Sequence, residues 1–458
     1  MVRGLAVDAL TKVHRTSCLA HEALVPIVGK ARLSPEDQAF LWELVHGVTR
    51  HRVTIDHIIR AFSRVRLGKV HPRVLQALRI AVYQIVWLDR IPARAAVYET
   101  VEIVKSRFPG WTVKFTNGCL RSISRAIDIK IGGTLDDDQL SRAVPISGFR
   151  FCLFERPIFP EPDADLVGSL AARHGYPGWL VARWLDRFGR ERAVDILRAG
   201  NESPSLWLRP APGRFPDLVR ELTKRRIRHA AEDEPAPPAI RLIGSPGRIQ
   251  DLPGFSHGWF VVQDRSAMKP AALLAPPPGA RVLDLCAAPG GKATQLALDV
   301  GPEGSVVAVD RDPRRLERLT ESIGRLGITN VAAVAADLTE EGIDLGEPFD
   351  HVLIDVPCSN TGVLGKRVEA RHRVTAEFVT GLVPVQRALL EAATRHVAPG
   401  GALVYSTCAL LAEENGTLVR SAIEAGLPFE IEEEAETLPR AGTFDGGYAV
   451  RLRRVGEG

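Results

Sequence analysis

Two of the six cysteines lie where thiol chemistry is plausible, because each follows an apolar run typical of a buried strand. Cys358 lies in Asp355-Val356-Pro357-Cys358-Ser359, and Cys408 ends Ser406-Thr407-Cys408. If the two preceding strands are neighbours in a parallel sheet, both thiols open into one crevice at the carboxyl ends of the strands. A buried cysteine is usually inert packing. Two thiols in two strand-end loops favour a catalytic pair instead.

A ligand site is predicted next to these thiols, at residues 281–297. The apolar run Val282 to Leu285 leads into Cys286-Ala287-Ala288-Pro289-Gly290-Gly291-Lys292 and then into a helix-forming segment. The order strand, glycine-rich loop, helix presents free backbone N–H groups and the positive end of a helix dipole to a nucleotide-like ligand. A triphosphate loop is excluded because Cys286 occupies the position of its first glycine. The loop also lacks G-x-G-x-x-G, which weakens a nicotinamide site without excluding it.

Three carboxylates at predicted strand ends support a nucleoside ligand. Asp310 lies 19 residues after Gly291, where a Rossmann-type sheet places the acid that binds ribose hydroxyls. Asp337 and Asp355 end the next two strands. Each acid alone could be a helix cap, but three around one sheet edge favour a nucleoside site.

The thiols suit methyl transfer to carbon 5 of a pyrimidine, which is too weak a nucleophile to take a methyl group directly. A thiolate that adds to carbon 6 makes carbon 5 nucleophilic, so covalent catalysis divides one hard step into two easier ones. The proton on carbon 5 must then leave and the thiolate must be expelled, so a second acid or base nearby is useful.

The elements that must position these residues form an α/β domain behind a helical one. Strand-like runs at 281–286, 305–310, 331–335, 350–355 and 401–406 alternate with helical stretches, which predicts a doubly wound, Rossmann-like sheet. An antiparallel pair from 429–431 and 448–453 is expected at its edge. We therefore expect a multidomain chain with these parts: an all-α bundle over 1–130, a linker over 131–162, a small α+β subdomain over 163–262 and the α/β domain over 263–458.

Charge is unevenly distributed along the 458 residues. Residues 1–130 contain 21 Lys and Arg against 10 Asp and Glu, a net charge of +11, and the total of +4 leaves −7 for the remainder. This asymmetry predicts a polyanionic partner for the N-terminal part, although a solvated basic surface would have the same composition. We see no secretory signal, membrane span or paired cysteine motif, so we expect a cytoplasmic protein, a monomer without a metal site.

The N-terminal part resembles the NusB-like RNA-binding domain, through Asp37 to Phe40, Leu44 to Val48, Leu78 to Gln84, Ala95 to Glu99 and Phe115 to Arg121. The C-terminal part resembles the NOL1/NOP2/Sun family of RNA (cytosine-5)-methyltransferases, which have a class I methyltransferase fold. The matching motifs are Gln263 to Met268, Cys286 to Lys292, Asp355 to Ser359 and Ser406 to Cys408. The order of the two parts is that of the bacterial small-subunit ribosomal RNA type.

The resemblance implies S-adenosylmethionine as the cofactor, ribosomal RNA as the partner, Cys408 as the nucleophile and Cys358 as the group that assists release. It also implies the cofactor residues Cys286, Ala287, Ala288, Pro289, Gly290, Gly291, Lys292, Asp310, Asp337 and Asp355. The sequence departs from the family at 209–211, 365–371 and 445–448, which bears on substrate contacts. Two alternatives stay open: an RNA-binding or ribosome-assembly protein with an inactive methyltransferase fold, and a nicotinamide-dependent enzyme.

Overall fold

A computed structural model describes the chain except for residues 17, 204, 233–236, 245, 341 and 457–458. It divides into two compact units. The helical unit contains residues 1–202 and 367–373, and the sheet unit contains residues 203–366 and 374–458. No helix of the described residues is long and apolar enough to span a membrane.

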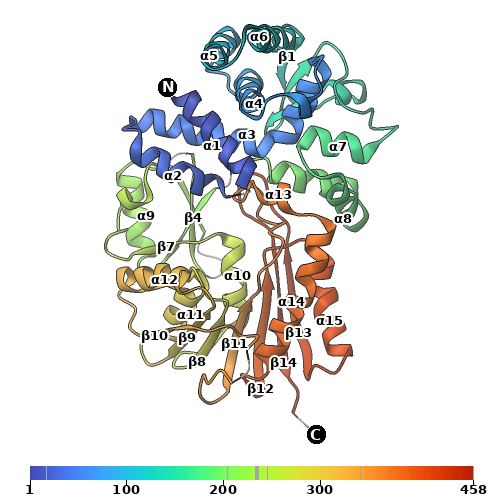
Figure 1. The fold of residues 1–458 in the computed structure, drawn as a ribbon. Coiled ribbons are helices and arrows are strands. Elements are labelled where there is room, and N and C mark those ends of the chain that lie inside the picture. Colours follow the sequence, from blue (N-terminus) through green and yellow to red (C-terminus); the bar gives the residue numbers. More distant parts are fainter. Residues whose placement is uncertain (17, 204, 233–236, 245, 341, 457–458) are drawn as a thin grey trace. The chain divides into compact units, whose positions relative to one another are not determined.

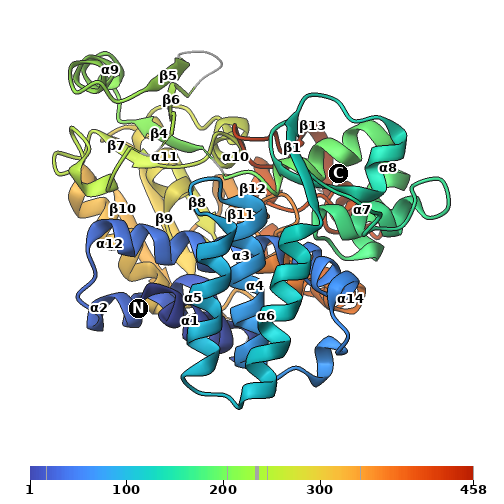
Figure 2. The same cartoon turned by 90° about the horizontal axis from the view of Figure 1, so that it is seen from above.

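The helical unit begins with six helices, as the periodicity predicts (Figure 2). Ser34 caps α3 by accepting the N–H of Asp37, and Pro92 precedes α5. The helices are α1 (Val2–Thr16), α2 (Ala20–Lys30), α3 (Pro35–Phe62), α4 (Pro72–Trp87), α5 (Ala93–Lys105) and α6 (Gly110–Arg125).

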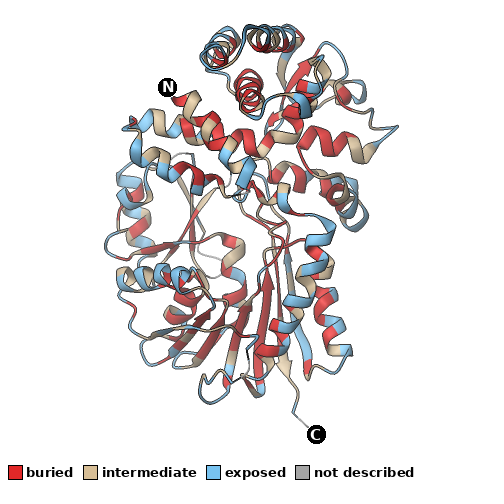
Figure 3. Cartoon of the chain, viewed as in Figure 1, coloured by how far each residue is buried: buried red, intermediate tan, exposed pale blue. Residues whose placement is uncertain are grey.

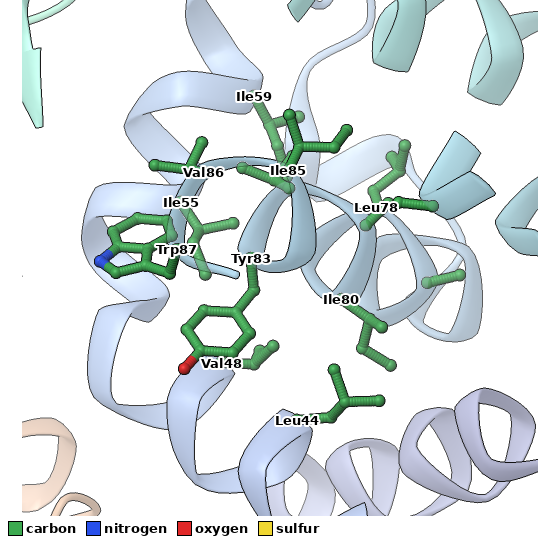
Figure 4. Close-up of a cluster of buried hydrophobic side chains, with 14 of the residues drawn as sticks. Leu44, Val48, Ile55, Ile59, Leu78, Ile80, Tyr83, Ile85, Val86 and Trp87 are labelled. Atoms are coloured by element: carbon green, nitrogen blue, oxygen red, sulfur yellow. The ribbon is translucent and has the colours of Figure 1, made fainter. Parts of the chain in front are cut away.

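Helix α4 is the core of this bundle because it is apolar on most of its faces. Residues Gln76 to Trp87 are all buried, and Figure 4 shows side chains of α3 and α4 gathered around Tyr83. A Cβ on Gly47 would lie 2.0 Å from the Tyr83 ring, so this close approach requires glycine. A buried helix of this kind is what the all-α bundle expected for this part of the chain requires.

Residues 131–162 were expected to form a linker, but they contain two strands of a small sheet. These are β2 (Ala143–Ser147) and β3 (Arg150–Phe154), which form a three-stranded antiparallel sheet with β1 (Ile127–Gly132) in the order β1-β3-β2. Phe151 to Phe154 are buried. Helices α7 (Leu166–His174) and α8 (Gly178–Ala199) complete the helical unit, so the boundary falls after residue 202 and not at 162.

The sheet unit begins with a small α+β layer. Its strands are β4 (Leu206–Pro210), β5 (His229–Glu232), β6 (Ala239–Leu242) and β7 (Phe260–Val262), in the order β5-β6-β4-β7, with α9 (Phe215–Lys224) beside them. These strands and this helix have the α+β composition expected for this part of the chain.

A seven-stranded sheet forms the body of this unit, in the order β10-β9-β8-β11-β12-β14-β13. The first five strands in this order are parallel, and β14 and β13 are antiparallel at the edge, as expected. The bounds are β8 (Arg281–Leu285), β9 (Ser305–Asp310), β10 (Val331–Ala335), β11 (Phe349–Asp355), β12 (Val397–Thr407), β13 (Phe429–Thr437) and β14 (Gly447–Arg454).

Helices cover both faces of this sheet, and its inner strands are buried along most of their length, whereas few residues of the edge strands β10 and β13 are buried (Figures 1 and 3). Alternate residues along a strand face opposite sides, so Val282 packs toward one group of helices and Leu283 toward the other. One face carries α10 (Arg265–Leu274), α11 (Gly291–Val300) and α12 (Pro313–Leu326). The other carries α14 (Ala376–Thr394) and α15 (Gly416–Glu424).

Candidate active site

The glycine-rich loop turns sharply between β8 and α11. Gly290 has a φ of 104°, and a Cβ there would lie 2.4 Å from Leu319 Cδ1, so both its conformation and its surroundings require glycine. Burial raises the pKa of Cys286 to about 12. The Cys286 thiol therefore stays protonated, as expected for a wall of the pocket rather than a third nucleophile.

Asp310 holds this loop through its carboxylate. The N–H of Ala288 donates to Oδ2 at 3.1 Å, and the N–H of Asp312 donates to Oδ1 at 3.0 Å. Arg315 lies 3.4 Å from the same Oδ2. The strand-end carboxylate thus ties the loop to the adjacent strand, a role that the sequence did not predict.

Asp337, another of the three strand-end acids, accepts hydrogen bonds within its own turn. Its Oδ1 accepts the N–H of Thr339 at 3.0 Å and the Thr339 hydroxyl at 2.7 Å, and these hydrogen bonds lower the pKa of Asp337. This geometry is that of a cap.

Asp284 is a second buried acid that sequence reasoning missed, in the middle of strand β8. Both carboxylate oxygens are buried without a hydrogen-bond partner among the described residues. Burial raises the pKa of Asp284 to about 8, with Lys292 acting in the opposite direction. An acid inside an apolar strand was the available signal, since an unpaired buried carboxylate is costly unless a ligand uses it.

Arg209 supports the loop from the small α+β layer. The side chain is 3% exposed, and its Nε donates to Gln263 Oε1 at 2.7 Å while a terminal nitrogen donates to Thr294 Oγ1 at 3.0 Å. Thr294 belongs to the first turns of α11. Arg209 therefore connects two segments 85 residues apart, and it lies two residues before Ala211, where the sequence departs from the Arg-x-Asn motif of the family.

The two thiols meet, as predicted from the strand order. Strands β11 and β12 are parallel neighbours, with Asp355 opposite Ser406. The Sγ atoms of Cys358 and Cys408 lie 3.0 Å apart. Cys408 is half-buried and lines a cavity of about 80 Å³, here called the Cys408 cavity, whereas Cys358 is buried and is not among the lining residues. Of the two sulfurs, Cys408 is the one presented to a ligand.

Lys292 places a cation on the wall of the Cys408 cavity. Its Nζ lies 2.7 Å from Asp355 Oδ2, and the Ser406 hydroxyl donates to Asp355 Oδ1 at 2.8 Å. Burial opposes the charge of Lys292, but Asp355, Asp284 and Cys408 together raise its pKa. Lys292 and Cys408 therefore line the same cavity.

Two adjacent residues after β12 hold the two thiol loops, and the sequence analysis did not single them out. Glu414 accepts the Ser359 N–H at 2.8 Å and a Gln386 amide hydrogen at 3.0 Å. Asn415 accepts the Thr407 hydroxyl at 2.6 Å and donates to Ala409 O at 3.1 Å. Both side chains are fully buried. Glu414 thus positions the Cys358 loop, and Asn415 positions the residues on either side of Cys408.

Replacing Glu414 with glutamine is expected to lower both stability and turnover. One carboxylate oxygen accepts the Ser359 N–H and the Gln386 amide, and the other accepts the Ser359 hydroxyl. In either orientation the glutamine NH₂ replaces one of these acceptors, and a buried donor left unpaired costs about 1–3 kcal/mol. Urea unfolding measures the free energy of unfolding. A fall in kcat reports that Cys358 is no longer held in its position. Glu413→Gln is the matched control, because Glu413 is adjacent and only half-buried. Equal effects of the two changes would contradict this role of Glu414.

A second ion cluster lines the opposite part of the Cys408 cavity. Lys366 Nζ lies 2.5 Å from Asp264 Oδ2 and 2.8 Å from Asp445 Oδ2. Burial raises the pKa of Asp445 to about 6, while Lys366 acts in the opposite direction. Lys366 lies in the segment 365–371, where the sequence departs from the family, and it forms an ion pair with Asp445, the first residue of the segment 445–448.

Comparisons with known proteins agree with this geometry. A family model described as 16S rRNA methyltransferase RsmB/F matches residues 271–443, and a NusB family model matches residues 1–125. A probable ribosomal RNA small subunit methyltransferase B from Synechocystis is 33% identical over 416 residues, which cover 90% of this chain and 86% of the relative. The chain belongs to the RsmB/F methyltransferase family. It is an enzyme, and its cofactor is S-adenosylmethionine.

Two further comparisons extend over the fold. The ribosomal RNA small subunit methyltransferase B of Escherichia coli strain SMS-3-5 is 31% identical over 469 residues and covers 98% of both chains. A crystal structure of a methyltransferase homolog from Pyrococcus horikoshii is 27% identical, with a TM-score of 0.57, and covers 64% of this chain and 99% of its own. The predicted NusB-like bundle and methyltransferase-type sheet are therefore confirmed. Family membership also removes the nicotinamide-dependent alternative.

Proposed function

We propose that this methyltransferase transfers a methyl group to carbon 5 of a cytosine in small-subunit ribosomal RNA, with Cys408 as the nucleophile. The observation that carries the proposal is the pair of sulfurs 3.0 Å apart, of which Cys408 lines a cavity and Cys358 is buried behind it. The names of the curated relatives support the choice of RNA.

The residues present fit S-adenosylmethionine. The unpartnered carboxylate of Asp284 suits its ammonium group. Bound there, the cofactor supplies an electrophilic methyl group. We assign its binding to Asp284 together with the residues expected from the sequence, namely Cys286 to Lys292, Asp310, Asp337 and Asp355.

Side chains of the sheet unit carry out the remaining steps of the reaction. The Cys408 Sγ adds as a thiolate to carbon 6 of the cytosine in the Cys408 cavity, which Lys292 also lines. Carbon 5 then accepts the methyl group, so it carries both the new methyl group and its original hydrogen. As the bond between carbon 6 and Cys408 Sγ breaks, the Cys358 thiol gives its proton to the departing sulfur. The resulting Cys358 thiolate takes the proton from carbon 5, and the electron pair left behind restores the double bond between carbons 5 and 6. The Cys408 thiol and burial raise the pKa of Cys358, so Cys358 keeps its proton while Cys408 attacks, and it lies next to the bond that breaks.

Replacing Asp284 with asparagine is expected to weaken cofactor binding and to change how stability depends on pH. The ammonium group loses a charged partner worth about 1.5–3 kcal/mol, which is about 10- to 100-fold in Kd. Without cofactor, the folded state holds a proton between the unfolded pKa of about 3.9 and the folded pKa of about 8. The free energy of unfolding therefore falls as pH rises through this window.

Asp284→Asn should remove this dependence of the free energy of unfolding on pH, because an amide does not titrate. Calorimetry with S-adenosylmethionine measures the first effect, and urea unfolding from pH 5 to pH 9 measures the second. Asp350→Asn, an exposed change on strand β11, is the control. An unchanged pH slope together with unchanged cofactor affinity would contradict the role given to Asp284.

The proposed reaction is tested by its product. The purified enzyme is incubated with a transcript of 16S ribosomal RNA and methyl-labelled S-adenosylmethionine, and the RNA is digested to nucleosides. We expect the label in 5-methylcytidine alone. Label on another nucleoside would refute the cytosine assignment, and absence of cofactor binding by calorimetry would favour an RNA-binding assembly protein with an inactive fold.

A further inference from the structure

The helical unit contains a basic pocket that lies outside the site described above. The pocket has a volume of about 70 Å³, well above the ~10–15 Å³ that one water needs. Its walls come from α1, α3 and α4 and from the segment 367–373, which belongs to the helical unit. The polar residues that line it include His14, Arg52, Gln76, Arg79, His372 and Arg373.

Arg52 is the uncompensated charge in this pocket. The neighbouring Arg79 is neutralised by Asp56, with Nε and a terminal nitrogen 2.8 and 2.7 Å from its two oxygens. Arg52 has no hydrogen bond or ion pair with any described residue. Burial and the charge of Arg79 lower the pKa of Arg52 to about 10, so it is still a cation at neutral pH. The Arg52 guanidinium therefore lies near that of Arg79, and Asp56 forms its hydrogen bonds with Arg79.

The rest of the lining adds positive charge and a free donor. Arg373 is exposed and has no ion pair among the described residues. The lining also includes the carboxylate of Glu369, which accepts the N–H of Ala20 at 2.6 Å. The three arginines Arg52, Arg79 and Arg373 therefore face the two carboxylates of Asp56 and Glu369, a formal excess of one positive charge. Gln76 is 2% exposed; its Oε1 accepts from Arg79 at 3.3 Å, and its Nε2 has no partner among the described residues. These groups together require an anion that accepts several hydrogen bonds.

We propose that this pocket binds a backbone phosphate of the RNA substrate through Arg52, Gln76 and Arg373. A phosphate has the size and the acceptor geometry that match guanidinium and amide donors. The inference rests on the proposed function, since that function supplies RNA as the polyanion. The excess positive charge of residues 1–130 favours a nucleic acid over an isolated anion. The bound phosphate would lie against 367–373, the segment that follows the Cys358 loop and Lys366 in the chain.

The test is the salt dependence of RNA binding by the full-length protein. Filter binding of a labelled 16S ribosomal RNA transcript is measured at several salt concentrations for wild type, Arg52→Gln, Arg373→Gln and Arg52→Lys. We expect Arg52→Gln and Arg373→Gln each to weaken binding and to reduce the slope of log Kd against log salt by about one, and Arg52→Lys to keep the slope. Arg94→Gln is the matched control, an exposed arginine on α5. Circular dichroism and thermal melting establish that each variant is folded.

Two results would overturn the inference. The first is an equal loss of slope in Arg94→Gln, which would make the effect one of total charge. The second is an unchanged slope in Arg52→Gln together with loss of inorganic phosphate binding, followed by ³¹P resonance broadening, which would assign the pocket to a free anion. Calorimetry with S-adenosylmethionine and the nucleoside assay are run on wild type in parallel. If wild type makes 5-methylcytidine and the slope does not change, only the phosphate site fails; if it makes none, the proposed function fails separately.

Discussion

Replacing Cys408 with alanine is expected to abolish methyl transfer, with a loss on the order of 10³-fold or more. The change removes the atom that would activate carbon 5, and the buried Cys358 is not among the residues that line the cavity. Turnover is measured as label transferred to RNA under saturating S-adenosylmethionine. Calorimetry should give an unchanged cofactor affinity, which separates loss of chemistry from loss of binding.

Cys119→Ala provides the matched control for this change. Cys119 is a buried thiol on α6 of the helical unit, and burial raises its pKa to about 11, so it is inert. Its removal should leave kcat unchanged. Full activity of Cys408→Ala would overturn the assignment of the nucleophile, whatever the control does.

Replacing Cys358 with alanine is expected to have the opposite signature, which is accumulation of a covalent complex between protein and RNA. Cys408 is still present and adds to carbon 6, but the group 3.0 Å from its sulfur that assists release is gone. A band that resists denaturing electrophoresis should appear with RNA and S-adenosylmethionine, at the expense of turnover.

The double variant Cys358→Ala, Cys408→Ala is the control for the complex. It should form no band, because the complex requires the Cys408 thiolate. Turnover of Cys358→Ala at the wild-type rate without any trapped complex would contradict the role given to Cys358.

The sheet and the meeting of the two thiols could be predicted from sequence because both follow from local rules. Apolar runs and breakers locate parallel strands, and the carboxyl ends of neighbouring parallel strands lie at one edge. That reasoning places Cys358 and Cys408 together from their positions alone. The glycine-rich loop could also be predicted from the sequence, because Gly290 has a positive φ that few other residues adopt.

The supporting residues could not be predicted, because their function depends on contacts distant in sequence. Arg209 reaches Thr294, and Glu414 reaches Ser359. Nothing in the local pattern around either residue reports its partner. The region 131–162 differed for another reason: its glycines and prolines are typical of a linker, yet Pro145 lies in the edge strand β2, where a missing N–H is tolerated.

The central claim, covalent catalysis by Cys408 on cytosine, is tested most directly by mapping the complex that Cys358→Ala traps. The complex is formed with 16S ribosomal RNA and methyl-labelled S-adenosylmethionine, digested with protease and nuclease, and analysed by mass spectrometry. The account predicts a single modified peptide in which Cys408 is linked to a cytidine that carries the labelled methyl group. A cytidine linked to another cysteine, or a linked nucleoside other than cytidine, would contradict it.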